Sequence, residues 1–211
     1  MTDYFISATG TEIGKTFLLE NLISNLIKSE KKVNAIKPII SGINENNFYE
    51  SDSYKIAKAL SDEVITYNSL KNISPFQFEH PLSPDQAAKL INKKISYLEL
   101  LNFTQDFLEN NKKNDFNFIE GVGGVYVPIN QQKLVLNLIE DLNIKLILVS
   151  NNYLGCLSHT LSIIKNLPAI DIKLFFNNYP YNDNLIENIN SLQNFTDIEI
   201  YTNIDDLIQN L

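Results

Sequence analysis

The chain has 211 residues, a net charge of −8 at pH 7, and 17 basic residues, all of them lysines. This length predicts a single domain spanning residues 1–211, and the acidic balance argues against nucleic acid as a partner. The sequence shows neither an apolar run of membrane-spanning length nor a secretory signal, so we expect a cytoplasmic protein without a membrane partner. One cysteine and two histidines argue against a disulfide framework or a His/Cys metal site.

The beginning of the chain carries the most informative motif. An apolar run at residues 4–7 predicts a strand, and apolar residues on one helical face predict a helix over 16–29. The glycine-containing loop between them has the context of a phosphate-binding loop, in which backbone N–H groups and a helix N-terminus point at one anion. Lys15 would contact the terminal phosphates and the Thr16 hydroxyl would bind Mg²⁺, although Thr9 replaces the first glycine of the strict G-x-x-x-x-G-K-[ST] pattern.

Strand and helix patterns alternate along the rest of the chain. They predict strands at 33–38, 117–120, 145–150, 172–176 and 198–201, and helices at 51–60, 96–111, 133–142, 157–166, 184–192 and 204–210. Residues 44–50 read as polar turns, 61–85 as a long ordered loop, and 125–128 as a further extended segment. The pattern predicts an α/β fold with three layers: a mostly parallel sheet with helices on both faces, like that of P-loop NTPases and similar to Rossmann folds.

Charged residues follow the predicted strands at the edge where ligands bind in such sheets. Glu120 ends a strand just before Gly121, Gly123 and Gly124, which favours a metal ligand over a misplaced charge. Asp52 opens a helix, where it is either a second ligand for Mg²⁺ or only a helix cap.

Further polar residues occupy neighbouring strand ends. Lys37 precedes a proline and either binds a second anion beside the phosphates or is a solvated lysine, and Ser41 is placed to contact the same substrate. Asn177 and Asn178 suit the edge of an adenine base, against the background of an asparagine-rich chain. The only cysteine, Cys156, is interpreted as a packed residue rather than a nucleophile.

Seven segments, taken in order, resemble the ATP-dependent dethiobiotin synthetase family. They cover most of the chain and are residues 9–16, 37–42, 51–52, 75–84, 120–124, 154–159 and Asn177. The resemblance implies closure of a ureido ring: 7,8-diaminononanoate takes up CO₂ as a carbamate, ATP phosphorylates the carbamate, and the second amine displaces phosphate. It also implies a homodimer in which the helix start at 154–158 lies near the substrate carboxylate of the other subunit.

The family's site residues carry over by position. The resemblance implies catalytic roles for Thr11, Lys15 and Lys37, and metal ligation by Thr16, Asp52 and Glu120. It implies nucleotide binding by Glu12, Ile13, Gly14, Lys15, Thr16, Phe17, Asp52, Glu120, Gly121, Val122, Gly123, Asn177 and Asn178, and substrate binding by Thr11, Lys37, Ser41, Leu154, Gly155 and Ser158.

The chain departs from the family pattern in several places. Ala8 and Gly10 replace a glycine and an aspartate, Ser158 replaces an asparagine, Asp85 replaces a histidine, and the C-terminal purine signature is missing. Two alternatives share the fold. The first is a partition-type ATPase, which would carry an extra lysine where this chain has Gly10. The second is a cobyrinate-type amide synthetase, which normally carries a glutaminase domain, and this chain has neither the length nor the Cys/His pair for one.

Overall fold

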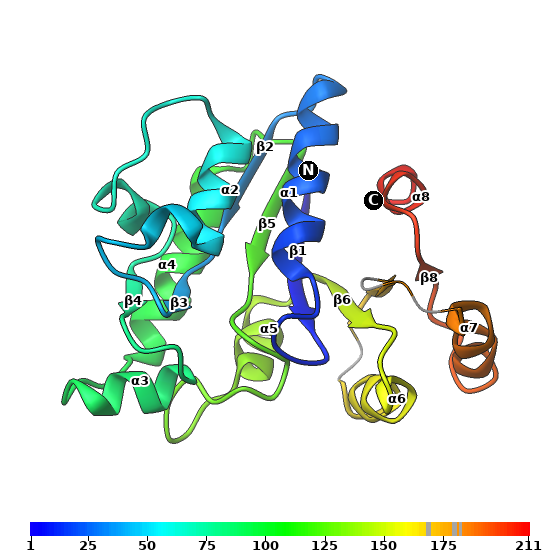
Figure 1. Ribbon diagram of the computed structural model, residues 1–211. Helices are drawn as coiled ribbons and strands as arrows, with labels where there is room; N and C mark the ends of the chain where they lie inside the picture. Colours follow the sequence, from blue (N-terminus) through cyan, green and yellow to red (C-terminus); the bar gives the residue numbers. More distant parts are fainter. Residues whose placement is uncertain (168–169, 179–180, 182) are drawn as a thin grey trace.

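The computed structural model describes residues 1–167, 170–178, 181 and 183–211. Its centre is a parallel sheet of six strands in the order β2-β5-β1-β6-β7-β8 (Figure 1). The strands are β1 (Thr2–Ala8), β2 (Val33–Ile36), β5 (Phe116–Glu120), β6 (Lys145–Asn151), β7 (Ile172–Asn177) and β8 (Ile200–Tyr201). The order reverses direction at β1, so the carboxyl end of β1 is the place where such sheets bind ligands.

Helices cover both faces of this sheet because its strands are apolar on both sides. In β1, Tyr4 and Ile6 pack on one face and Phe5 on the other, as the two-residue period of a strand requires. One face holds α1 (Lys15–Lys28), α2 (Asp52–Leu60) and α8 (Ile204–Gln209), and the other holds α4 (Tyr97–Asn110), α5 (Val135–Leu142), α6 (Cys156–Asn166) and α7 (Leu185–Gln193). Helix α3 (Pro84–Leu90) contacts the short strands β3 (Ile39–Ser41) and β4 (Phe76–Phe78). The predicted three-layer α/β fold is therefore confirmed.

A second, two-stranded parallel sheet corrects two predictions. The strand expected at 33–38 ends at Ile36, and after Lys37 and Pro38 the chain enters β3 (Ile39–Ser41), which pairs with β4 (Phe76–Phe78). The expected loop at 61–85 therefore contains β4, a 3-10 turn η2 (Ser69–Asn72) and the start of α3. Another 3-10 turn, η1 (Phe48–Glu50), lies within the polar segment 44–50.

The prediction of an extended segment at 125–128 is wrong. The segment forms turns and makes one isolated bridge, between Pro128 and Leu134. The main chain of this segment is hydrogen-bonded to the end of β1, because the Val125 N–H donates to the Ala8 carbonyl.

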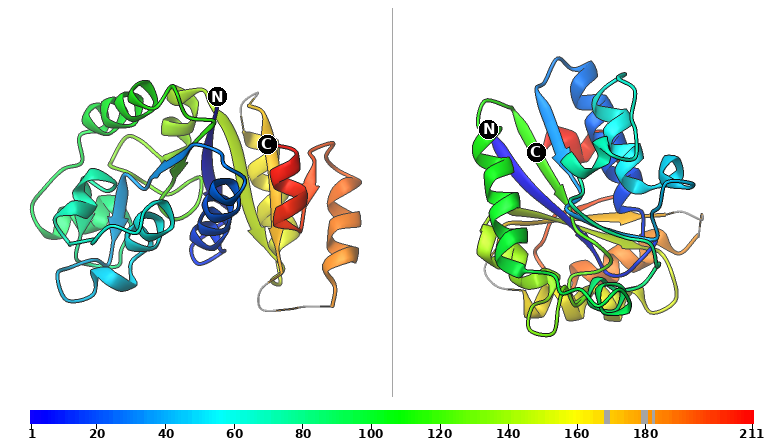
Figure 2. Two further views of the ribbon diagram at one scale, coloured as in Figure 1. Left: turned by 90° about the horizontal axis from the view of Figure 1, so that it is seen from above. Right: turned by 90° about the vertical axis from the view of Figure 1, so that its left-hand side faces the viewer.

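The C-terminus returns to the first strand. Helix α8 lies beside α1 in the left view of Figure 2, and the Tyr4 hydroxyl donates to the Leu211 carbonyl oxygen over 2.9 Å. This contact joins the two ends of the chain across one face of the sheet.

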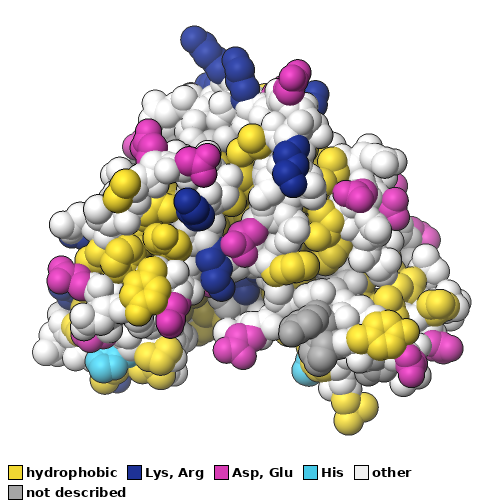
Figure 3. Space-filling model, turned by 45° about the horizontal axis from the view of Figure 1, so that its top comes forward, with side chains coloured by type: hydrophobic (Ala, Val, Ile, Leu, Met, Phe, Trp, Pro, Cys, Tyr) yellow, Lys and Arg dark blue, Asp and Glu magenta, His cyan; other side chains and the backbone are white. Residues whose placement is uncertain are grey.

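The surface mixes charges of both signs. On the face drawn in Figure 3, lysine and acidic side chains are interspersed with apolar ones. An anionic ligand would therefore be attracted by a local site rather than by this face as a whole. Among the described residues, no helix has the length and apolar character needed to cross a membrane.

Candidate active site

The loop between β1 and α1 has the backbone of a phosphate-binding loop. Gly14 adopts a left-handed conformation, with φ of 106°, just before the first residue of α1. A Cβ at this position would lie 2.3 Å from Nδ2 of Asn177, so only glycine fits. The Asn177 amide donates to the Ile13 carbonyl over 3.1 Å and thereby fixes the loop to the end of β7.

Lys15 and Thr16 begin α1 and face the carboxyl edge of the sheet. Lys15 is almost fully buried, and burial together with the nearby charge of Lys37 lowers the pKa of Lys15 to about 8, against the opposing pull of Glu120 and Asp52. The Thr16 hydroxyl donates to Oε1 of Glu120 over 2.8 Å. Helix α1 thus presents a cation and a hydroxyl next to a buried carboxylate.

Lys37 is held between two carboxylates. Its Nζ donates to Oδ2 of Asp52 over 2.8 Å and to Oε1 of Glu120 over 2.5 Å. Glu120 is completely buried and Lys37 is 4% exposed, so the pair is a buried ion pair. The alternative that Asp52 merely caps α2 is wrong, because Ser51 is the cap and accepts from the Tyr54 N–H.

The pKa shifts of this cluster follow from opposing effects. Burial alone would lower the pKa of Lys37, but the charges of Glu120 and Asp52 outweigh it and hold that pKa above its ordinary value. Burial would likewise raise the pKa of Asp52, but the charge and hydrogen bond of Lys37 outweigh it and lower that pKa. Lys37 and Asp52 therefore stabilise each other's charged forms.

The donor set suits a hard cation. Oε2 of Glu120 is buried without a hydrogen-bond partner in the described part of the chain. A buried carboxylate oxygen normally has a partner, so this oxygen is available to bind a cation. No cluster of three or more His, Cys, Asp or Glu side chains occurs among the described residues, so a metal here would also need the Thr16 hydroxyl and phosphate oxygens. Mg²⁺ characteristically binds through few carboxylates plus substrate phosphates, and the residues therefore fit it.

A cavity of about 800 Å³ lies over this cluster. It brings together most of the residues predicted from the sequence: Thr11, Glu12, Ile13, Gly14, Lys15, Thr16, Phe17, Lys37, Ser41, Asp52, Val122 and Gly123. It also has a wall that the site prediction missed, made of Ile40, Pro81, Leu82, Ser83, Pro84, Gln86 and Val127. The only signal for this wall was the run of prolines within the segment 75–84, which carries no chemistry of its own.

Other predicted residues lie outside this cavity. Leu154, Gly155 and Ser158 are at the start of α6, and Asn177 and Asn178 are at the end of β7. Glu120 and Gly121 do not line it either, and a Cβ at Gly121 would come within 2.7 Å of the Phe5 ring. A single copy of the chain therefore does not bring the α6 residues to the phosphate loop.

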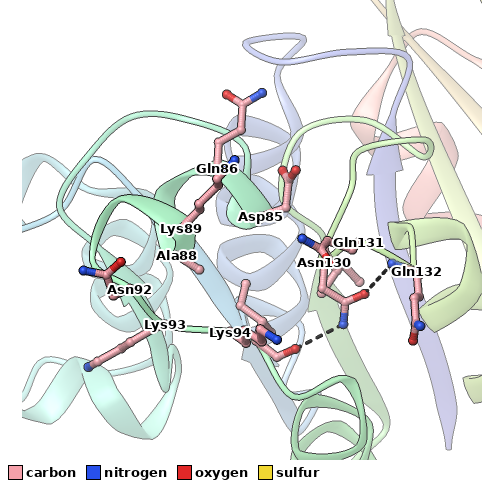
Figure 4. Close-up of a pocket in the computed structure, with 12 residues that line it drawn as sticks. Asp85, Gln86, Ala88, Lys89, Asn92, Lys93, Lys94, Asn130, Gln131 and Gln132 are labelled. Atoms are coloured by element: carbon pink, nitrogen blue, oxygen red, sulfur yellow. Dashed lines mark hydrogen bonds between the residues drawn. The ribbon is translucent and has the colours of Figure 1, made fainter.

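A second cavity, of about 730 Å³, lies between α3 and the loop at 129–132 (Figure 4). Its lysines, Lys89, Lys93 and Lys94, are exposed, whereas Lys15 and Lys37 of the first cavity are buried. Solvated lysines bind an anion more weakly than buried ones, so the cavity at the phosphate loop is the better candidate for an anion site.

A parallel sheet with this loop between its first strand and first helix defines the class of P-loop nucleoside triphosphatases. Solved structures agree on the fold. The cell division protein MinD of Aquifex aeolicus has a TM-score of 0.54 at 14% identity, covering 99% of this chain and 86% of that one. MinD of Pyrococcus horikoshii, solved in complex with Mg-ADP, has a TM-score of 0.52 at 16% identity, covering 94% and 79%.

Sequence comparisons identify the family. A family model described as an AAA domain matches residues 2–209. ATP-dependent dethiobiotin synthetase BioD of Legionella pneumophila (strain Paris) is 35% identical over 92% of this chain and 88% of its own length. The same enzyme of Acidiphilium cryptum (strain JF-5) is 32% identical over 82% and 77%. The chain belongs to the ATP-dependent dethiobiotin synthetase family and is an ATP-dependent ligase of biotin biosynthesis.

Proposed function

We propose that this ligase converts 7,8-diaminononanoate, CO₂ and ATP into dethiobiotin, ADP and phosphate. The observation that carries the proposal is the second buried lysine. Lys37 lies in the same cavity as Lys15 of the phosphate loop and contacts Asp52 and Glu120 at 2.8 and 2.5 Å. Joining a carbamate to the terminal phosphate brings two anions together, and Lys37 supplies a second cation beside the phosphate loop to offset their repulsion.

The reaction balances in three steps. One amine of the substrate bonds to the carbon of CO₂ and loses a proton, giving a carbamate. A carbamate oxygen then bonds to the γ-phosphorus while the bond from that phosphorus to ADP breaks. The second amine finally bonds to the carbamoyl carbon, phosphate leaves, and a proton is lost as the ring closes.

Each anion has its own lysine in this proposal. Lys15 and the N–H groups of the phosphate loop hold the triphosphate, and Lys37 holds the carbamate against it. Thr16, Asp52 and Glu120 would hold Mg²⁺, which offsets phosphate charge when bound. Lys37 contacts the same two carboxylates, so its ammonium is held beside the place where the carbamate and the terminal phosphate would meet.

The hydroxyl groups of Thr11 and Ser41 are proposed to position the diamine. Both residues line the cavity, and Oγ of Ser41 is buried without a hydrogen-bond partner among the described residues, so it is free to bind an amine. The apolar wall of Ile40 and Pro81 would exclude water from the reactive carbamoyl phosphate.

A homodimer is proposed to complete the site. Leu154, at the start of α6, is fully exposed to solvent, and this helix start lies outside the cavity of its own chain. A second subunit would bring Leu154, Gly155 and Ser158 to the substrate carboxylate, which a helix N-terminus favours. Purine contacts by Asn177 and Asn178, and the cytoplasmic location, stay predictions.

The test is phosphate release from ATP and Mg²⁺ with isotopically labelled bicarbonate, with and without 7,8-diaminononanoate. We expect release that depends on the diamine, and a product whose mass corresponds to the cyclic urea containing one labelled carbon. Hydrolysis that does not depend on the diamine would contradict the proposal and favour a partition-type ATPase.

The same assay with Leu154→Asp, followed by sedimentation, tests whether loss of the dimer removes turnover.

A further inference from the structure

Two buried serines connect the main chain of Lys37 to α2. Ser74 and Ser53 are both completely buried, and their hydroxyl oxygens lie 2.5 Å apart. The Ser74 hydroxyl also lies 2.5 Å from the carbonyl oxygen of Lys37. Ser53 is the second residue of α2 and follows Asp52 directly, so the chain of contacts runs from α2 through Ser74 to the lysine.

The direction of these hydrogen bonds follows from the number of protons available. A carbonyl oxygen only accepts, and a serine hydroxyl has one proton. Ser74 must therefore donate to Lys37, and it must accept the proton that Ser53 donates. The order is Ser53 to Ser74 to the Lys37 carbonyl, and each hydroxyl in it has a single possible role.

This arrangement holds Lys37 at both ends. Its ammonium contacts Asp52, and its carbonyl is tied through Ser74 to Ser53, the next residue of the same helix turn. The neighbouring carbonyl, that of Pro38, accepts from the Phe76 N–H of β4. The support is needed here because residues 37 and 38 lie between β2 and β3, outside the ladders of both sheets.

We propose that Ser74, oriented by Ser53, is a positioning residue that sets Lys37 and Asp52 relative to each other as one unit. It touches neither substrate nor nucleotide, and it acts through the backbone of Lys37. The first test of this inference measures turnover and so rests on the proposed function, whereas the second measures the reactivity of Lys37 and does not.

The first test is steady-state kinetics of Ser74→Ala, Ser74→Thr and Ser150→Ala. Ser150 shares a buried hydroxyl contact of 2.8 Å with Thr160, and that pair does not contact Lys37, so it is the matched control. We expect Ser74→Ala to lower kcat by about 10- to 100-fold, as misplacement of a reacting group does. KM for ATP should stay within about twofold, because the phosphate loop is untouched, and Ser74→Thr should restore kcat. A Ser74→Ala kcat equal to that of Ser150→Ala would overturn the proposal.

The second test is acetic anhydride labelling of the full-length protein, with the modified lysines located by mass spectrometry. In Ser74→Ala we expect Lys37 to be acetylated several-fold faster than in the wild type, while the Lys15 rate stays unchanged and Ser150→Ala alters neither. Equal acceleration at both lysines, or none, would overturn the proposal. If Ser74→Ala does not fold, Ser53→Ala is judged by the same pair of rates. If the wild type fails to make dethiobiotin, the proposed function fails, and the labelling still decides the positioning role.

Discussion

Lys37 occupies an unusual position for a lysine. Burial of an ammonium is costly unless it is paired and hydrogen-bonded, and here two carboxylates supply both conditions. An apolar side chain would fill the same space at lower cost in stability, so the buried charge of Lys37 points to a functional use.

Replacing Lys37 by alanine should separate catalysis from nucleotide binding. We expect Lys37→Ala to lower turnover by about 10³-fold, since it removes the cation that faces the carbamate. ATP affinity in Mg²⁺ should change only a few-fold, because Lys15 and the loop amides remain. Turnover and ATP titration are compared with Lys58→Ala, which removes an exposed lysine of α2. Activity within a few-fold of the wild type would show that Lys37 does not bind the carbamate.

Asn177 links two elements, the end of β7 and the phosphate loop. Its amide donates to the Ile13 carbonyl, so the side chain is engaged by the loop. This contact allows two roles to be distinguished: support of the loop, or contact with the purine.

Asn177→Ala should weaken binding of ATP and of inorganic tripolyphosphate equally if the residue supports the loop. Loss of one hydrogen bond corresponds to about a tenfold change in affinity. Calorimetric titration with both ligands checks this, with Asn166→Ala as a control on the exposed end of α6. Weaker binding of ATP alone would instead assign the side chain to the purine.

Helix α1 owes its position to a regular apolar stripe. Leu22 is completely buried under it, while Ile27 on the same helix is 40% exposed. We expect Leu22→Ala to lower the free energy of unfolding by about 2–5 kcal/mol, because it leaves a cavity, and Ile27→Ala by less than about 1 kcal/mol. Urea denaturation measures both. Equal losses would show that the stripe does not anchor the helix.

The elements that the sequence predicted are those with enough residues to show a period. Helix α1 and strands β1, β5 and β6 are found within about two residues of their expected ends, which is the usual uncertainty of such boundaries. Strands β3 and β4 have three residues each and pair across a separation of 37 residues, so neither their pattern nor their partner was visible. The same limit applies to the site. Lys37, Asp52 and Glu120 were each identified at an element end, but their mutual contacts depend on how β3 leaves the main sheet.

At the scale of the whole molecule, the burial of Tyr4 makes stability depend on pH. Burial, with smaller effects of Asp171 and Tyr201, raises the pKa of Tyr4 to about 12 from an ordinary value of 10.0. The raised pKa means that the folded state holds this proton more tightly than the unfolded state. Its contribution is complete below pH 10 and is lost as the pH rises through 12.

Tyr4→Phe should therefore show a smaller loss of stability than the wild type over this alkaline range. Urea denaturation at a series of pH values from neutral to alkaline provides the comparison. Tyr49→Phe, at a tyrosine that is 54% exposed, is the control and should follow the wild type. A Tyr4→Phe curve parallel to that of the wild type would mean that the buried Tyr4 hydroxyl does not couple folding to pH.

The pairing of buried charges at the phosphate loop also has a consequence for the stability of the folded protein. The ammonium groups of Lys15 and Lys37 face the carboxylates of Asp52 and Glu120, so these four side chains balance one another's charge, while the fifth charged group of the site, Glu12, is exposed to solvent. Because the buried charges are paired within the protein, we expect the fold not to depend on the supply of magnesium. Exhaustive chelation should leave the melting temperature unchanged within about 1 °C, whereas a fold that relied on bound metal would lose stability by mass action.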